Sequence, residues 1–120
     1  RSVSWARRCV QETVLRVAAL RDAEYEMEHH KRLGKKAGLT ATDIEAVQQA
    51  EHGLTGRRGM LIDATDDLIR HRQISDAVYA ELMRHINEKE LTALLLLVTN
   101  YDGLATLMDV LHVPLDEPRP

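Results

Sequence analysis

The feature that most constrains the fold is a long apolar segment near the end of the chain. Asn87 is typical of a helix N-cap because Glu90 follows three residues later, and Pro114 forces the helix to end. The segment between them is about 25 residues long, or ~37 Å at 1.5 Å per residue. Its run 94–98 consists of leucines and a valine, so this helix is apolar on every side. Such a helix must be buried on most faces, and we expect it to be a central helix, a subunit interface, or both.

The rest of the chain also predicts helices. No stretch alternates polar and apolar residues for long enough to form a strand, and we find no internal repeat or low-complexity segment. The expected helices cover roughly 3–20, 22–37, 40–53, 57–71 and 75–86, before the long one. Gly38 is expected to end the second, Thr40 with Asp43 to begin the third, and Ser75 to begin the fifth. The sequence therefore predicts an all-α fold of about six helices.

Length and charge narrow the class of protein. A chain of 120 residues predicts a single domain over 1–120, and its start at Arg1 rather than Met is compatible with an N-terminal truncation that removed a helix or two. The net charge of −3 and an aromatic content of 3% disfavour a nucleic-acid partner, which usually needs a basic face and stacking rings. No signal peptide is found, and run 94–98 is shorter than the ~20 residues of a membrane span. We expect a cytoplasmic protein without a membrane partner.

The chain has a single cysteine. Cys9 alone can form neither an intramolecular disulfide nor a dithiol catalytic pair. Free cysteine is among the most buried residue types and behaves as a small hydrophobe. We therefore expect Cys9 to have a structural role.

Glu26 and His30 are the main candidates for chemistry. Residues four apart on a helix lie on one face, so a carboxylate stands one turn before an imidazole. A carboxylate beside a histidine raises the histidine pKa and fixes the ring, and such a pair can move protons near neutral pH. The alternative is an ordinary ion pair on a solvated helix surface.

The same segment also contains potential metal ligands. Glu26 and His29 form a Glu-x-x-His motif, but ferritin-like di-metal sites need two such motifs and two further glutamates. The chain has one such motif, so a di-iron site is not expected. A single metal ion held by Glu26, by His29 or His30, and by a third ligand from another helix remains an open alternative; our prediction is no metal and no cofactor.

Residues 25–30, Tyr25-Glu26-Met27-Glu28-His29-His30, resemble the Tyr-Glu-Trp-x-x-His pattern of carboxymuconolactone decarboxylase family members that lack redox cysteines, with Met27 in place of the Trp. The resemblance continues in order over nearly the whole chain, through 14–20, 37–40, 67–68, 74–76, 100–101 and 113–116.

The same family includes alkyl hydroperoxidase D-like proteins, which carry Cys-x-x-Cys-x-x-x-His preceded by a Glu. With His30 aligned on that final His, Ala23 and Glu26 stand at the cysteine positions. Gln11 stands at the upstream Glu, with Glu12 next to it.

The resemblance implies an all-α, alkyl hydroperoxidase D-like fold that assembles as a homotrimer or homohexamer. It also implies a cofactor-independent, carboxymuconolactone decarboxylase-like lyase that acts on a small carboxylated or lactone-type organic acid. Loss of CO2 leaves carbanion or enolate character on the substrate, which a positioned acid must protonate. In this hypothesis His30 supplies the proton, and Glu26 orients and polarises the imidazole.

Arg16, Gln11 and Tyr101 are the expected substrate-binding residues. By its position on the first predicted helix, Arg16 is expected near the substrate pocket around His30, and a guanidinium can bind a substrate carboxylate. Tyr101 either faces His30 or bonds a backbone carbonyl. Two other classes of function remain: a non-catalytic oligomeric scaffold or ligand-binding protein of the same fold, and a hydroperoxide reductase, whose dithiol mechanism the single Cys9 does not support.

Overall fold

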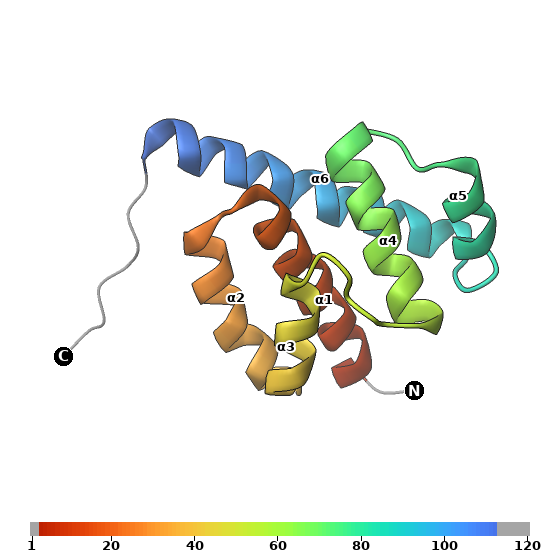
Figure 1. Cartoon of the computed structure of the whole chain (residues 1–120), viewed down its shortest axis with the longest axis horizontal. Coiled ribbons are helices and arrows are strands. Elements are labelled where there is room, and N and C mark those ends of the chain that lie inside the picture. Colours follow the sequence, from red (N-terminus) through yellow and green to blue (C-terminus); the bar gives the residue numbers. More distant parts are fainter. Residues whose placement is uncertain (1–2, 113–120) are drawn as a thin grey trace.

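The structure, a computed structural model, describes residues 3–112, and side chains from residue 6 onward. Within that part of the chain it contains six helices and no strand, which confirms the all-α prediction (Figure 1). The helices are α1 (Val3–Arg21), α2 (Glu24–Lys36), α3 (Ala41–Gln48), α4 (Gly56–His71), α5 (Asp76–Leu82) and α6 (Glu88–Leu111). Pro114, expected to end the last helix, lies outside the described residues.

The helix starts follow the local signals in the sequence. Thr40 and Asp43 form a reciprocal capping box at the start of α3, and Asn87 and Glu90 form another at the start of α6. In each, a side chain accepts a hydrogen bond from the backbone of the other residue, which satisfies two donors that the first helical turn leaves open. Gly38, just beyond α2, has a φ of 104°, as expected for a glycine that ends a helix.

Two helices are shorter than predicted. α3 ends at Gln48 rather than near residue 53, because the backbone turns extended at Gln49, and the carbonyls of this segment accept hydrogen bonds from α1 instead of continuing the helix. α5 ends at Leu82 rather than near Ile86, because Asn87 must be extended to cap α6 and the four residues before it form a turn. Local propensity had suggested longer helices in both places.

The central helix is α1, which packs against α2, α3, α4 and α6. Its segment 12–18 is buried throughout. By contrast, α6 lies across one side of the molecule, and its C-terminal half reaches away from α4 and α5 (Figure 1). The expectation that the long apolar helix is central is therefore wrong for this chain, because α1 already fills that place; its role as a subunit interface stays a prediction.

The burial of α6 is confined to one narrow stripe. Its buried residues are Leu94, Val98, Asp102 and Ala105. By length and composition α6 is apolar enough to cross a membrane, but 22% of its most apolar window is buried inside the protein. This is weak evidence for a membrane span, because core helices of soluble proteins pass the same test.

Candidate functional site

His30 is held by a residue of the central helix. The ring lies on α2 with 5% of its surface exposed, and its Nδ1 is 2.7 Å from Oε1 of Gln11 on α1. An amide oxygen only accepts, so this contact corresponds to the tautomer in which Nδ1 carries the proton and Nε2 keeps its lone pair. Among the described residues it is the one hydrogen bond of the His30 ring. The orientation of the Gln11 amide thus assigns Nε2 as the basic atom.

Aromatic contacts enclose the same ring. Tyr101 of α6 stands edge-on to His30, with ring centroids 5.2 Å apart and an interplanar angle of 89°. His29 is also edge-on, at 5.0 Å. Of the two roles considered for Tyr101, the geometry favours the one that faces His30. Residues from α1, α2 and α6 therefore meet at this imidazole.

The pKa of His30 moves in the direction opposite to the prediction. Burial, followed by the neighbouring His29, lowers the pKa of His30 from 6.5 to about 4. A desolvated imidazole is harder to charge, because the cation loses its hydration. His30 is therefore neutral at pH 7 and has no imidazolium proton to donate, and its lone pair is less basic than that of a free imidazole.

Glu26 is buried without a partner. It is 3% exposed, and within residues 6–112 neither of its carboxylate oxygens has a hydrogen-bond partner. Burial raises the pKa of Glu26, Arg21 lowers it, and Asp109 raises it further, with a net rise. The predicted ion pair of Glu26 with His30 is thus absent, because Gln11 holds the imidazole and the carboxyl one turn earlier stands alone. A buried polar group without a partner is costly and calls for a functional explanation.

The expectation that Arg16 binds a substrate carboxylate does not fit its surroundings. Arg16 is 1% exposed, and its guanidinium makes five hydrogen bonds of 2.6 to 3.2 Å. The acceptors are both carboxylate oxygens of Asp66 and the carbonyls of Val47, Gln49 and Ala50. A guanidinium has five N–H donors, so none is left for a substrate. Arg16 instead ties α1 to α4 and to the segment after α3.

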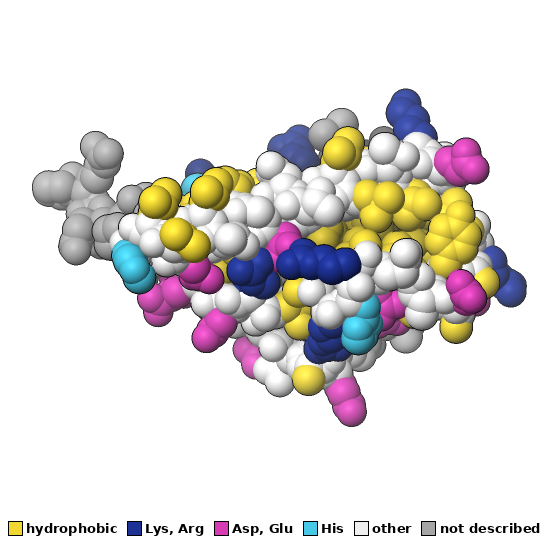
Figure 2. Space-filling view, turned by 90° about the horizontal axis from the view of Figure 1, so that it is seen from above, with side chains coloured by type: hydrophobic (Ala, Val, Ile, Leu, Met, Phe, Trp, Pro, Cys, Tyr) yellow, Lys and Arg dark blue, Asp and Glu magenta, His cyan; other side chains and the backbone are white. Residues whose placement is uncertain are grey.

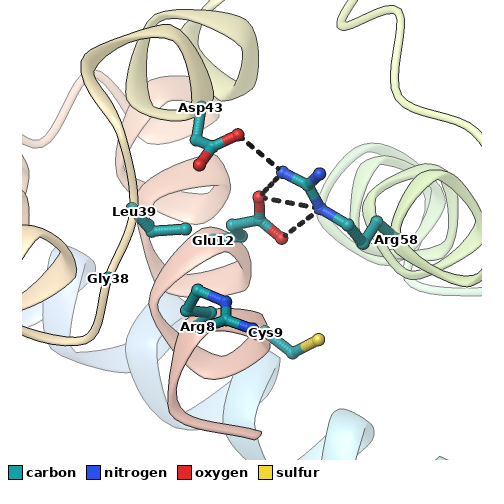
Figure 3. A pocket seen from close by; sticks show the side chains of 7 residues that line it. All are labelled: Arg8, Cys9, Glu12, Gly38, Leu39, Asp43 and Arg58. Carbon is teal, nitrogen blue, oxygen red and sulfur yellow. Dashed lines mark hydrogen bonds and ion pairs between the residues drawn. The ribbon is translucent and has the colours of Figure 1, made fainter. Parts of the chain in front are cut away.

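Sequence reasoning missed a second buried ionic group. Glu12, 2% exposed on α1, is bound by Arg58 of α4, and Arg58 also lies 3.1 Å from Asp43 of α3 (Figure 3). They border a hollow of about 170 Å³ that Arg8 and Cys9 also line. Burial raises the pKa of the Cys9 thiol, which makes it a poor nucleophile. No spacing in the sequence could show that Arg58 meets Glu12, since 46 residues separate them.

The described residues do not form a metal-binding group. No three side chains of His, Cys, Asp or Glu within residues 6–112 gather closely enough to hold a metal ion. A metal at Glu26 and His30 would need a ligand from outside this part of the chain. The open alternative of a single metal ion therefore gains no support from the described geometry.

Comparisons with known proteins identify the fold. No protein-family model matches the sequence, and no curated protein is significantly similar to it. Among solved structures, a protein of unknown function from Agrobacterium tumefaciens superposes with a TM-score of 0.85 at 12% sequence identity, over 92% of this chain and 79% of its own. That protein carries the provisional description antioxidant defence protein AhpD. The chain therefore has the alkyl hydroperoxidase D-like, or AhpD-like, helical fold, and similarity at this level shows the fold alone.

Proposed function

We propose that this chain is a cofactor-independent enzyme that transfers protons on a small carboxylated or lactone-type substrate, in the manner of a carboxymuconolactone decarboxylase. The observation that carries the proposal is the unpartnered, buried carboxyl of Glu26 one turn before the buried, neutral imidazole of His30. The substrate class comes from the resemblance of residues 25–30 to that family. The AhpD-like fold is compatible with it.

The two groups have complementary states. The environment of each group decides which of two titratable groups at one site is the acid and which is the base. Burial raises the pKa of Glu26, which favours a carboxyl that holds its proton, and it lowers the pKa of His30. Glu26 is therefore the proton donor and His30 the acceptor, which reverses the roles suggested by the sequence.

The chemistry follows from these states. In a decarboxylation the bond from the substrate carbon to its carboxylate breaks, CO2 leaves, and the electron pair stays on that carbon. Glu26 then gives its proton to the carbon. His30 accepts the proton of the substrate's carboxyl at Nε2 and returns it through water to Glu26, so that the acid becomes CO2 and product with no net gain or loss of protons. The hydrogen bond from Nδ1 to Gln11 holds the ring in place.

A dithiol peroxidase fits these residues less well. The positions that carry cysteines in peroxidase members of the family hold Ala23 and Glu26 here, and the thiol of Cys9 lies on another helix. Its raised pKa disfavours the thiolate that attacks a peroxide. A non-catalytic scaffold of the same fold is the alternative that the experiment must separate.

The experiment follows proton transfer directly. The protein is incubated in D2O with carboxymuconolactone and a panel of related small lactone acids, and mass spectrometry measures deuterium incorporation and loss of CO2. We expect Glu26→Gln and His30→Gln to lower the rate by ~10²–10⁴-fold, as is usual for a lost general acid or base. Glu28→Gln is the matched control, because Glu28 is exposed on the same helix.

Two results would count against the proposal. If the wild type incorporates no deuterium with any compound of the panel, the scaffold alternative replaces the enzyme. If turnover occurs but survives both Glu26→Gln and His30→Gln, the chemistry lies elsewhere in the chain. Turnover that falls equally in the Glu28→Gln control would mean that the exposed face of α2 matters, rather than the buried pair.

A further inference from the structure

One face of α6 is exposed along its entire length and has the spacing of a helix-pairing seam. Its positions alternate in steps of four and three residues, as in a coiled coil. We call this face the α6 seam, and it consists of Lys89, Ala93, Leu96, Asn100, Gly103, Leu107 and Val110, all of them exposed. Leu96 is 66% exposed, Leu107 56% and Val110 69%. Figure 2 shows hydrophobic side chains gathered on α6 toward its C-terminal end.

Nothing among the described residues explains Gly103. Glycine inside a helix costs about 1 kcal/mol relative to alanine. A Cβ built on Gly103 meets no described atom within 4 Å, and the residue does not have a positive φ. Within residues 6–112 the absence of a side chain therefore serves no contact. It does allow another backbone to approach the middle of the α6 seam closely.

The two halves of α6 differ in shape. Beside the N-terminal half lies an open groove of about 420 Å³ between α1, α4 and α6. Its walls are mainly apolar and include Val10, Leu61, Ile86, Ala93, Leu94 and Leu97. The C-terminal half instead presents Leu107, Val110 and Leu111 without cover from the described part of the chain. The N-terminal half of α6 therefore borders a groove, and the exposed apolar side chains of its C-terminal half form a ridge.

We propose that α6 pairs antiparallel with α6 of a second copy of this chain, about a two-fold axis near Gly103. In antiparallel order the ridge of each copy meets the groove of the other, so both ends are covered by the same contact. On α6 the groove residues and the ridge residues are centred about 16 residues apart, or ~24 Å along the helix, which places the axis midway, between Asn100 and Gly103. Such a contact is isologous, so it closes a dimer and is also compatible with a hexamer.

The seam gives a definite register for this pairing. Leu96 of one copy lies opposite Leu107 of the other, and Ala93 lies opposite Val110. Asn100 then faces Gly103, where the missing side chain leaves room for an amide near the axis. A buried polar residue at one seam position is a common device for fixing a single register.

A second copy suits this face better than a lipid bilayer does. The exposed side of α6 includes Lys89, Thr92, Thr99 and Asn100, and polar groups of this kind are costly in a hydrocarbon core. Asp102 on the buried side is bound by Arg21 and Arg72, which anchors α6 to the rest of the protein. A helix of 24 residues is about 36 Å long, enough to supply much of the roughly 800 Å² per partner that stable interfaces bury.

Sedimentation equilibrium between 1 and 100 µM tests the contact. We expect the wild type to associate in even-numbered species, and Leu107→Glu and Gly103→Leu each to weaken association by at least tenfold. We expect Gly103→Leu to keep the fold, because no atom of the described residues lies within 4 Å of its Cβ, and circular dichroism checks this. Tyr79→Ser is the matched control: it removes a 45% exposed ring on α5, outside the seam, and should leave association unchanged.

Disulfide trapping tests the orientation in a Cys9→Ser background. A mixture of Leu96→Cys and Leu107→Cys chains should form a cross-linked heterodimer, while either chain alone should cross-link poorly. A parallel contact would give the opposite pattern and overturn the register. The proposal is overturned if the wild type stays monomeric at 100 µM, or if both seam variants associate as strongly as the wild type. It is also overturned if the wild type is monomeric and binds phosphatidylcholine vesicles.

Discussion

The substitution Glu26→Gln should make the protein more stable at pH 8, although it removes a group proposed to be catalytic. Glutamine has nearly the same shape as a protonated glutamate and cannot ionise. The Glu26 side chain is 3% exposed, and neither of its oxygens has a partner among the described residues. A buried carboxylate in that position lacks compensation for the water it has lost.

The pH dependence follows from the raised pKa of Glu26. Between its ordinary value of 4.5 and the raised value, the folded protein holds a proton that the unfolded chain releases. Stability therefore falls as the pH rises through that window, and it stays at the lower level above it. Each pKa unit corresponds to about 1.4 kcal/mol, and an unsatisfied buried group costs about 1–3 kcal/mol. We expect Glu26→Gln to gain about 1–2 kcal/mol at pH 8 on these principles and almost nothing at pH 4.5.

Urea unfolding at pH 4.5 and pH 8 measures this difference, at one protein concentration so that association is held constant. Glu28→Gln is the control, since its side chain is 53% exposed and should change little at either pH. If Glu26→Gln is less stable than the wild type at pH 8, then the carboxylate has a partner and the reasoning fails. Equal gains at both pH values would show that ionisation is not the cause.

Three further outcomes are expected. The free energy of unfolding should fall by up to about 3 kcal/mol as the pH drops from 6.5 to about 4, because His30 binds a proton at a higher pH in the unfolded chain than in the folded protein. In urea unfolding measured at several pH values, His30→Gln should flatten this slope. An unchanged slope would refute the lowered pKa of His30. Arg16→Met should lower the free energy of unfolding by about 3–5 kcal/mol, because it leaves Asp66 as a largely buried, unpaired charge. A melting temperature near that of the wild type would contradict this expectation. Gly59→Ala should lower the melting temperature markedly, because its Cβ would stand 2.4 Å from the backbone oxygen of Leu54; an unchanged melting temperature would contradict this close approach.

The fold could be predicted largely from short-range signals. Helix caps depend on residues three apart, so Thr40 with Asp43 and Asn87 with Glu90 marked the starts of α3 and α6 correctly. Asp67 of α4 accepts a hydrogen bond from the backbone of Ser75, the N-cap of α5. Such contacts form within one turn or one loop, and the local sequence contains both partners.

The candidate site was only partly predictable. Glu26 and His30 were correctly placed on one helix, and alignment on His30 singled out Gln11. Their interactions were not predicted, because the spacing of four residues suggested a bond that the folded chain does not make. Tyr101 was left with two possible roles, and the packing of α6 against α2 decided between them.

The sequence by itself therefore determined the helices, their caps and the residues that could carry chemistry, because each of these depends on neighbours within one or two turns. The tertiary structure alone decided which helix is central. It also decided that all N–H donors of the Arg16 guanidinium bond to Asp66 and to distant carbonyls, that His30 is neutral, and that Glu26 has no hydrogen-bond partner among the described residues. These properties depend on burial and on partners 19 to 50 residues away. The sign of a pKa shift is set by such surroundings, and a spacing along one helix does not contain them.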